Sequence, residues 1–331
     1  MKNYKIAVIG ACGMVGQTMR KVLEERKVPV QEIFFFDAPV NAGKQIDFNG
    51  KPVTVEELTP DSFDRGIDIA LFAVDAAISK IYAPIAAEKG CIAIDNSSFF
   101  RMDENTPLIV PEVNPEDIWS HKGIIANPNC TTIQAVVALN PLHKAFGIKR
   151  LIYSTYQSVS GAGLGGILDL ERTLKGEAHQ QFAHPIAGNC IPQIDVFLED
   201  GYTAEEEKMI RETSKILKAP NMKITATAVR VPVEYGHSES LNITFEKPYD
   251  LEEVRNILKN APGVVLVEDN ANNVYPLARN AAGTDQVYVG RVRRDFSEEN
   301  SLNIWVVADN IRKGAATNAV QIAERIMERG L

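Results

Sequence analysis

Short apolar runs, rich in β-branched and aromatic residues, recur along the first part of the chain. Runs of this length and composition are typical of strands that are buried on both faces of a sheet. Between them lie segments with helical spacing, the first of which ends near Glu25. This alternation predicts a parallel, doubly wound α/β sheet. The runs that we expect to form its strands are 5–9, 32–36, 67–74, 90–95 and 123–126.

The pattern changes after about residue 150, where strand-like runs outnumber helical segments. A change of this kind indicates an α+β domain, in which helices cover one face of a mixed sheet. We also expect a last helix, 315–329, to pack back on the first domain. The other expected helices are 164–174 and 204–217, and the expected strands are 151–159, 224–233, 240–246, 264–267, 287–292 and 302–307.

Composition narrows the class of protein. The 331 residues are 45% hydrophobic and 24% charged, which is typical of a globular protein, and the net charge of −8 argues against a broad nucleic-acid surface. We find no signal-peptide pattern before the first strand and no apolar run of about 18 residues, so we expect a cytoplasmic protein with no membrane partner. The four cysteines lack metal-ligand spacing, so we expect neither a metal site nor a disulfide scaffold.

A glycine-rich turn follows the first expected strand and opens the first expected helix. Gly10, Gly13 and Gly16 would let the backbone approach a pyrophosphate, for which the helix N-terminus supplies N–H groups. The alternative is a tight strand–helix turn without a ligand, because the spacing is GxxGxxG rather than the commoner GxGxxG.

The end of the second expected strand bears on the choice of cofactor. Asp37 stands where an acidic side chain can accept a hydrogen bond from a ribose 2′-hydroxyl, which favours NAD. A 2′-phosphate would be repelled there unless a cation compensated, and Lys44 is the nearest candidate. These residues leave NAD and NADP open.

Cys130 follows an expected strand and begins a helix-like run, 131–139. The positive end of a helix dipole favours the thiolate, which can attack a carbonyl carbon to give a thiohemiacetal or a thioester. The alternative is a small buried hydrophobic residue, which is the commoner role of a cysteine.

Two residues further along are candidates for a base and an anion clamp. His237 could serve as the base, and the fork of Arg230 matches a carboxylate. Pro232 and Gly236 argue against an unbroken strand between them, so a bend could place both side chains in one pocket. The alternatives are a surface histidine and a surface salt bridge.

Three further charged residues are weaker candidates. Arg101 lies just past the carboxyl end of an expected strand, where ligands bind in open α/β sheets. Glu205 and Lys208 are three positions apart on an expected helix and share a face. A solvated surface pair is the alternative for these two.

Taken in order, these segments resemble the aspartate-β-semialdehyde dehydrogenase family over essentially the whole chain. The resemblance is specific because many motifs occur in the order that the family has. They are 10–16 (GACGMVG), 95–98 (DNSS), 127–130 (NPNC), 157–161 (QSVSG), 191–195 (IPQID), 205–208 (EEEK), 230–233 (RVPV) with His237, 289–293 (VGRVR) and 313–316 (KGAA).

The resemblance implies a role for each matching residue. Cys130 would be the nucleophile, His237 the general base, and Gln157 would orient the substrate. Arg230 and Glu205 would hold the substrate carboxylate and amino group. Arg101, Asn129 and Lys208 would bind the phosphate. The implied cofactor contacts are Gly10, Ala11, Cys12, Gly13, Met14, Val15, Gly16, Ser160, Gly161 and Asn310.

The resemblance also implies a reaction and an architecture. The reaction would be reduction of L-aspartyl 4-phosphate to L-aspartate 4-semialdehyde, with release of phosphate, through a thioester on Cys130. It stands early in lysine, threonine and methionine biosynthesis and takes NADP, or NAD, as cofactor. We expect a Rossmann-like domain, 1–129 completed by 313–331, and a catalytic and dimerisation domain, 130–312, in a homodimer or homotetramer.

One departure from the family concerns the cofactor. Ala38 and Val40 stand where NADP-using relatives carry serine and arginine, and Asp37 precedes them. We therefore predict that NADH is used at least as well as NADPH.

Two other functions remain as alternatives. An N-acetyl-γ-glutamyl-phosphate reductase would share the chemistry, but its substrate lacks the amino group that Glu205 would bind. A non-catalytic nucleotide-binding paralogue would not need Cys130, Gln157, Arg230 and His237 together.

Overall fold

The computed structural model describes residues 3–330, which form two compact units. Unit 1 contains the residues before Cys130 together with those from Ala315 onward, and unit 2 is Cys130–Gly314. Each unit has its own sheet, and each is described by itself.

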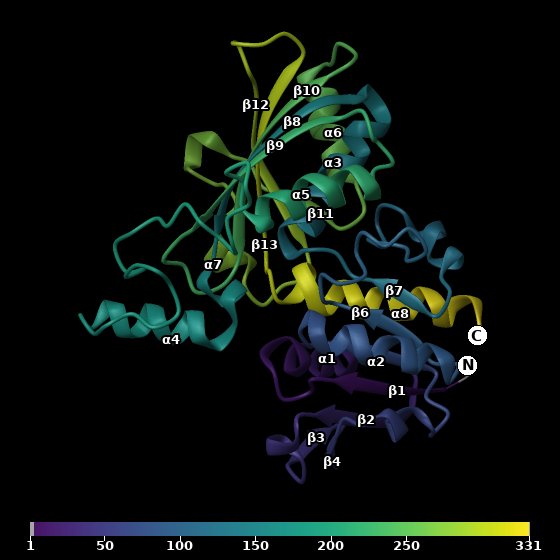
Figure 1. The fold of residues 1–331 in the computed structure, drawn as a ribbon. Coiled ribbons are helices and arrows are strands. Elements are labelled where there is room, and N and C mark those ends of the chain that lie inside the picture. Colours follow the sequence, from purple (N-terminus) through teal and green to yellow (C-terminus); the bar gives the residue numbers. More distant parts are fainter. Residues whose placement is uncertain (1–2, 331) are drawn as a thin grey trace. The chain divides into compact units, whose positions relative to one another are not determined.

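Unit 1 is built on a seven-stranded sheet with the order β3-β4-β2-β1-β5-β6-β7 (Figure 1). Its neighbouring strands run parallel except for the pair β3 and β4, so the predicted parallel, doubly wound sheet is confirmed. The strands are β1 (Tyr4–Ile9), β2 (Val30–Asp37), β3 (Gln45–Phe48), β4 (Lys51–Glu57), β5 (Ile69–Phe72), β6 (Ile92–Asp95) and β7 (Ile124–Ala126).

The β3–β4 hairpin was not among the expected elements, although its turn has a sequence signal. Asn49 and Gly50 connect the strands, and both have positive φ, 50° and 74°. Asn-Gly is the pair that two-residue hairpin turns favour, because both central residues must adopt this conformation.

Helices cover both faces of the unit 1 sheet. Ile6 and Val8 of β1 belong to the core cluster that includes α1 (Met14–Glu25) and α8 (Thr317–Arg329). Ala7 and Ile9 point the other way, into the cluster that includes α2 (Ala76–Glu88). Because successive side chains on a strand alternate between faces, this pattern gives three layers.

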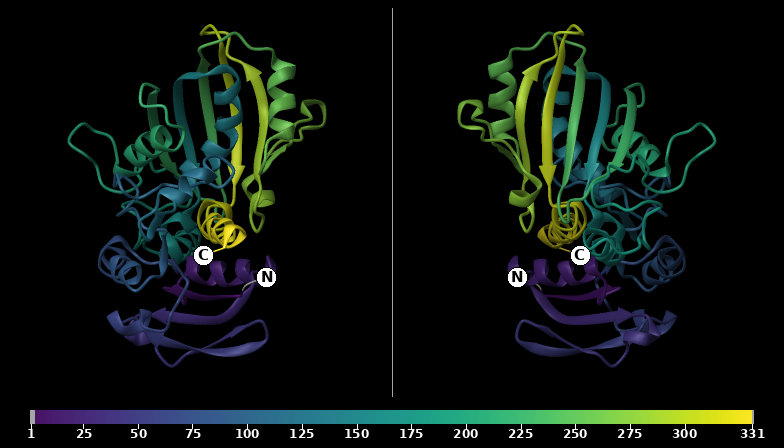
Figure 2. Two further views of the ribbon diagram at one scale, coloured as in Figure 1. Left: turned by 90° about the vertical axis from the view of Figure 1, so that its right-hand side faces the viewer. Right: turned by 90° about the vertical axis from the view of Figure 1, so that its left-hand side faces the viewer.

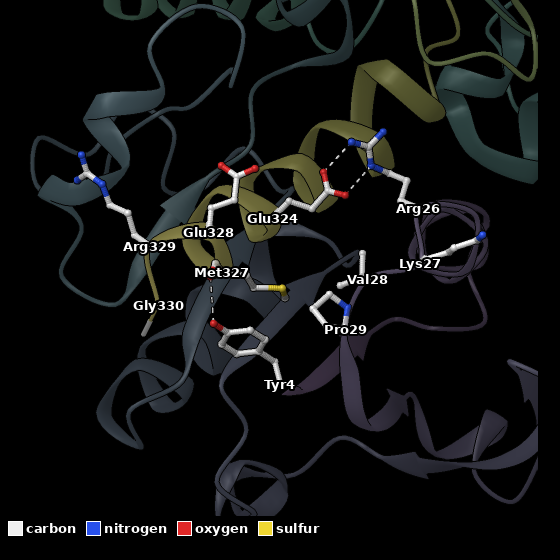
Figure 3. A pocket seen from close by; sticks show the side chains of 10 residues that line it. All are labelled: Tyr4, Arg26, Lys27, Val28, Pro29, Glu324, Met327, Glu328, Arg329 and Gly330. Atoms are coloured by element: carbon white, nitrogen blue, oxygen red, sulfur yellow. Dashed lines mark hydrogen bonds and ion pairs between the residues drawn. The ribbon is translucent and has the colours of Figure 1, made fainter. Parts of the chain in front are cut away.

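A groove of about 560 Å³ lies between the end of α1 and α8 (Figure 3). Across it the Tyr4 hydroxyl donates to the carbonyl oxygen of Met327 at 3.2 Å, and Arg26 binds Glu324 through two hydrogen bonds of 2.9 and 2.7 Å. Tyr4 is the first residue of β1, so the groove is at the opposite end of the sheet from the carboxyl ends of the strands, where ligands bind.

Unit 2 is built on a six-stranded sheet with the order β11-β12-β13-β10-β8-β9. Two pairs are parallel, β8 with β9 and β11 with β12, and the other pairs are antiparallel, so the predicted mixed sheet is confirmed. The strands are β8 (Ile148–Gln157), β9 (Lys223–Arg230), β10 (His237–Phe245), β11 (Val264–Leu266), β12 (Val287–Arg294) and β13 (Ser301–Ala308).

One face of this sheet is packed against α3 (Cys130–Phe146), α5 (Ala204–Ile216) and α6 (Leu251–Asn260) (Figures 1 and 2). On β8, Tyr153, Thr155 and Gln157 are buried toward the helices, whereas Tyr156 points the other way and is 40% exposed. The remaining helices of the unit, α4 (Gly163–Leu174) and α7 (Ala278–Ala281), lie outside this layer.

Short helical turns occur along both units. They are η1 (Pro39–Asn41), η2 (Pro60–Phe63), η3 (Pro115–Ser120), η4 (Val159–Ala162), η5 (Asn270–Asn272) and the π-type η6 (Arg312–Ala316).

The first or last residues of several strands and helices differ from the predicted ones. The strand expected over 224–233 ends at Arg230, because Pro232 cannot donate to a ladder. The strand expected over 240–246 already begins at His237. The helix expected over 131–139 continues to Phe146 and contains Pro141. Between residues 3 and 330, no helix combines the length and apolarity that crossing a membrane requires.

Candidate active site

The glycine-rich loop between β1 and α1 is held by close backbone contacts. Gly10 has φ of +79°, and a Cβ atom there would lie 2.5 Å from the carbonyl oxygen of Ala73. A Cβ atom at Gly16 would lie 2.1 Å from the carbonyl oxygen of Gly10. Gly13 is the N-cap of α1 and supplies no side-chain cap, so the first-turn N–H groups fit an anionic group such as a pyrophosphate. Ala11, Cys12, Met14 and Val15 complete this loop.

Asp37 ends β2 and is fixed by the same loop. Its Oδ2 accepts from the backbone N–H of Cys12 at 2.8 Å, and its Oδ1 accepts from the Ala38 N–H at 2.8 Å and from Asn41 Nδ2 at 2.7 Å. Lys44 donates to Asn41 Oδ1 at 2.5 Å rather than to the carboxylate. The carboxylate is therefore held beside the loop in the position that suits a ribose hydroxyl.

Cys130 is the first residue of α3 and is only partly buried. A Cβ atom at Gly314 would lie 2.8 Å from the Cys130 Cβ, so a side chain at position 314 would press on Cys130. Cys91 provides a contrast, because burial raises the pKa of its thiol to about 12. An accessible sulfur at a helix N-terminus has the surroundings of a reactive cysteine.

Gln157 ends β8 and connects two helices to the sheet. Its Nε2 donates to Thr131 Oγ1 at 2.9 Å, next to Cys130, and lies 3.4 Å from both Thr155 Oγ1 and Glu205 Oε1. The amide is fully buried, so these contacts fix its orientation.

His237 is fully buried, and its two ring nitrogens differ in their surroundings. The backbone N–H of Ser158 donates to Nδ1 at 3.0 Å, and Ser158 Oγ lies 3.1 Å from the same atom. In the neutral ring the proton is therefore on Nε2, which has no hydrogen-bond partner within residues 3–330. Burial and the charge of Arg230 hold the pKa of His237 well below its usual value.

Arg230 ends β9, and its guanidinium lies near the His237 ring. Its Nη1 donates to the carbonyl oxygen of Ser158 at 2.7 Å. A Cβ atom at Gly161, in η4, would lie 2.7 Å from Arg230 Nη1 and 3.2 Å from His237 Cε1. Burial lowers the pKa of Arg230, whereas its attraction to Glu205 and Cys130 acts in the opposite direction.

A loop from α4 covers the Arg230 guanidinium. The Phe182 ring centroid lies 5.7 Å from the guanidinium carbon, within the range of a cation–π contact. Asp169 of α4 holds this loop by accepting from the backbone N–H groups of Gln180 at 2.6 Å and Phe182 at 3.1 Å.

Glu205 and Lys208 lie in the first turns of α5, whose N-terminus is held by a capping box of Thr203 and Glu206. Lys208 Nζ contacts Glu205 Oε2 at 3.3 Å and Asp195 Oδ2 at 2.7 Å. Because Glu205 is only 6% exposed, this is not a solvated surface pair.

Asn310 and Ser160 complete the cluster in unit 2. Asn310 Oδ1 accepts from Ser158 Oγ at 3.1 Å and from the backbone N–H of Gly236 at 3.0 Å, and Ser160 Oγ lies 3.3 Å away. These bonds hold Ser158 against the His237 ring.

Arg101 and Asn129 belong to unit 1. Arg101 follows β6, is 8% exposed, and donates from Nη2 to the carbonyl oxygen of Asn96 at 2.8 Å. Asn129 directly precedes Cys130 and is also buried.

Comparisons with known proteins identify the family of the chain. Residues 5–121 match the semialdehyde dehydrogenase NAD-binding domain, and residues 139–313 match the semialdehyde dehydrogenase dimerisation domain. The chain is 52% identical to aspartate-semialdehyde dehydrogenase from Aquifex aeolicus, with 99% of each chain covered. The chain belongs to the aspartate-semialdehyde dehydrogenase family.

Other members of the aspartate-semialdehyde dehydrogenase family are similar over their full length. The relative from Bacillus subtilis is 45% identical, covering 100% of this chain and 99% of that protein. A crystal structure of aspartate semialdehyde dehydrogenase II from Vibrio cholerae, complexed with ASA, has a TM-score of 0.96 and 46% identity, with both chains covered completely.

Several residues of the site were not identified from the sequence of this aspartate-semialdehyde dehydrogenase family member. Ser158, Thr131, Gly314 and Phe182 lie against candidate side chains of other elements. Ser158, Thr131 and Gly314 lie inside or next to a motif, but only the fold shows what each contacts. Within residues 3–330, no group of three or more histidine, cysteine or acidic side chains could hold a metal ion.

Proposed function

We propose that this chain catalyses the phosphorylating aspartate-semialdehyde dehydrogenase reaction, with Cys130 as nucleophile. The observation that carries the proposal is the convergence in unit 2 of Cys130, Gln157, Glu205, Arg230 and His237, which come from different elements. A thiolate, an imidazole, an amide, a carboxylate and a guanidinium provide the groups that an amino-acid acyl phosphate requires.

The substrate would be held by charge complementarity. Arg230 would bind the α-carboxylate through its fork, and Glu205 would accept the α-ammonium group. Lys208, Arg101 and Asn129 would bind the phosphate. The Phe182 ring, packed against the Arg230 guanidinium, would fix the orientation of the guanidinium plane.

The thiolate of Cys130 would attack the carbonyl carbon of L-aspartyl 4-phosphate. A C–S bond forms, the C–O bond to phosphate breaks, and phosphate leaves with the bonding electron pair. The start of α3 and the charge of Arg230 favour the thiolate. The Gln157 amide would orient the carbonyl group of the substrate and of the thioester.

A bound nicotinamide cofactor would supply the hydride that reduces the thioester carbon. His237 would stabilise the resulting oxyanion by donating from Nε2–H. Breaking the C–S bond then gives L-aspartate 4-semialdehyde, and the Cys130 thiolate receives the same hydrogen bond. That His237 takes the proton of the Cys130 thiol as a general base stays a prediction. To do so through Nε2, the neutral ring would have to carry its proton on Nδ1, and the N–H of Ser158 that donates to Nδ1 disfavours this tautomer.

The cofactor would bind to the loop 10–16 and to Asp37, and the family resemblance implies further contacts from Ser160, Gly161 and Asn310. Because the Asp37 carboxylate is fixed and Val40 offers no charge to a 2′-phosphate, we infer that NADH is used at least as well as NADPH. A comparison of kcat/KM for the two cofactors tests this, and a strong preference for NADPH would contradict it.

We further infer that the enzyme is cytoplasmic. We also infer that it forms a homodimer through the face of the unit 2 sheet opposite the helices. This face carries Tyr156, Tyr275, Leu277 and Trp305, of which the first three are 38–49% exposed. Apolar and aromatic residues gathered on one face are typical of protein interfaces. Light scattering of the wild type and of Tyr156→Arg tests it, since the variant should shift toward monomer.

One assay separates the proposed function from the alternative reductase. Phosphate-dependent reduction of NAD and NADP is measured with L-aspartate 4-semialdehyde and, in parallel, with N-acetyl-glutamate semialdehyde. We expect turnover with the first substrate only, because Glu205 would lose its ammonium partner in the second. Turnover of the acetylated substrate alone would overturn the proposal.

A further inference from the structure

Glu239 is a fully buried carboxyl group without a compensating charge. It lies on β10, two residues after His237, and therefore on the same face of the strand. Neither of its oxygens has a hydrogen-bond donor or an ion-pair partner in the part of the chain that the structure describes. A carboxylate in such a place is strongly disfavoured relative to the neutral acid.

The group that Glu239 faces is the side-chain amide of Gln134 on α3. Gln134 Nε2 donates to the carbonyl oxygen of His237 at 3.3 Å, whereas Gln134 Oε1 is buried without a donor. Rotating the amide would place Oε1 against the His237 carbonyl oxygen, which is also an acceptor. A proton on Glu239 satisfies both side chains, because its O–H can donate to Oε1.

In the described part of the chain, the neighbours identified for Glu239 carry no positive charge. Thr155 of β8 and Val306 of β13 lie directly opposite it in the sheet. The nearby titratable groups are Tyr153 of β8, whose pKa is raised by burial and by Glu239, and Glu212 of α5.

His237, on the same strand, also remains neutral, because burial and Arg230 lower its pKa. Burial raises the pKa of Glu239 itself well above its ordinary value. Burial is the larger influence and favours the protonated form, whereas the Gln134 amide acts in the opposite direction on the pKa of Glu239.

We propose that Glu239 keeps its proton in the folded protein and that its O–H donates a hydrogen bond to Gln134 Oε1, forming a Glu239–Gln134 bridge that positions His237 relative to Cys130. Gln134 lies one helical turn after Cys130 on α3, and its amide holds the backbone of His237. The bridge therefore connects the helix that begins with the nucleophile to the strand that begins with the imidazole. Glu239 is a positioning residue, and this part of the proposal rests on the proposed function.

Infrared spectroscopy tests the proton without any assay of turnover. At neutral pH the wild type should show the C=O stretch of a protonated carboxyl group, and Glu239→Gln should lack it. Glu206→Gln is the matched control, because Glu206 is a buried carboxyl that accepts backbone N–H groups from Thr203 and Ala228. Loss of the band only in Glu239→Gln supports the proposal, and identical spectra for the wild type and Glu239→Gln overturn it.

The pH dependence of stability is a second test. A carboxyl group with a raised pKa in the folded state takes up a proton on folding, so its stabilising effect is lost as pH rises above its unfolded pKa of about 4.3. The Tm of Glu239→Gln relative to the wild type should therefore increase from about pH 5 to about pH 8. A relative Tm that stays constant over this range would mean that the carboxyl group is ionised in the folded state as well, and would overturn the proposal.

Kinetics test the positioning role. Glu239→Leu and Gln134→Leu should each lower kcat about ten- to a hundredfold with little change in KM, because they displace His237 without touching substrate. Glu239→Gln should keep kcat within about threefold, since its amide N–H can donate to Gln134 Oε1. If Glu239→Gln loses as much kcat as Glu239→Leu while folded, the bridge is not what positions His237.

Discussion

The glycine loop of unit 1 and the Cys130 cluster of unit 2 are built in different ways. The loop and Asp37 form one site from residues 10–37, and most of its contacts involve backbone N–H and carbonyl groups. The cluster brings together side chains from Cys130 to Asn310, and these contact each other directly. A local site of backbone groups can be inferred from spacing, whereas a cluster of distant side chains depends on strand register.

The two sites also differ in burial, which determines how they respond to change. Asp37 is half-buried and is held by exposed or half-buried neighbours. Gln157, Arg230 and His237 are almost completely buried. Altering a buried polar group leaves its partners without hydrogen bonds, so we expect larger effects in unit 2 than in unit 1.

The largest expected effect is that of Cys130→Ala. Removal of the sulfur prevents formation of the thioester, so turnover should be lost while Tm and oligomeric state are retained. Initial rates and light scattering measure this, with the exposed Cys190→Ala as the control that keeps full activity. Substantial turnover by Cys130→Ala would remove the basis for placing the chemistry in unit 2.

His237→Gln should lower kcat about a hundredfold or more, because the oxyanion loses a donor aligned by Ser158. It should also change the acid stability. The lowered pKa of His237 means that the unfolded chain binds a proton below about pH 6.5 that the folded chain does not, so wild-type stability falls as pH drops. Thermal unfolding at several pH values should show a weaker fall in His237→Gln, and an unchanged fall would contradict the buried neutral ring.

Arg230→Lys should raise KM for L-aspartate 4-semialdehyde about ten- to a hundredfold, because a single ammonium group cannot replace the two-pronged contact with a carboxylate. The effect on kcat should be smaller. Steady-state kinetics measure both constants, and Lys215→Arg, on α5, is a control that conserves charge. A variant with an unchanged KM would show that Arg230 does not bind the carboxylate.

Phe182→Leu should raise the same KM only about three- to tenfold, because the cation–π contact with Arg230 is lost while the loop keeps its backbone bonds to Asp169. Phe182→Tyr is the matched control, which keeps an aromatic face. If the leucine and tyrosine variants behave alike, the ring does not orient the guanidinium.

The smallest expected effect on overall activity is in unit 1. Asp37→Ser combined with Val40→Arg should raise kcat/KM for NADPH relative to NADH about tenfold or more, because it removes one negative charge and adds a positive one. Activity with the better cofactor should change little. Parallel measurements with NADH and NADPH test this, and an unchanged ratio would show that Asp37 does not determine specificity.

The sequence by itself determined the two architectures and most of the chemistry. Apolar runs and glycine spacing predicted the parallel sheet with its binding loop, and the motifs around Cys130, Arg230 and His237 indicated the family. These features are local, because a strand, a glycine turn or a motif is encoded within a few adjacent residues. The sequence missed elements with weaker periodicity, such as the β3–β4 hairpin.

Only the tertiary structure decided which side chains meet. The register of β8 and β10 brings Ser158 to the Nδ1 atom of His237, and the packing of α3 on β10 places Gln134 against Glu239. These contacts join residues that are 79 or more positions apart, and they set the ring tautomer and the charge of a buried acid. Protonation depends on burial and on neighbouring donors, which exist only after the helices have packed on the sheet.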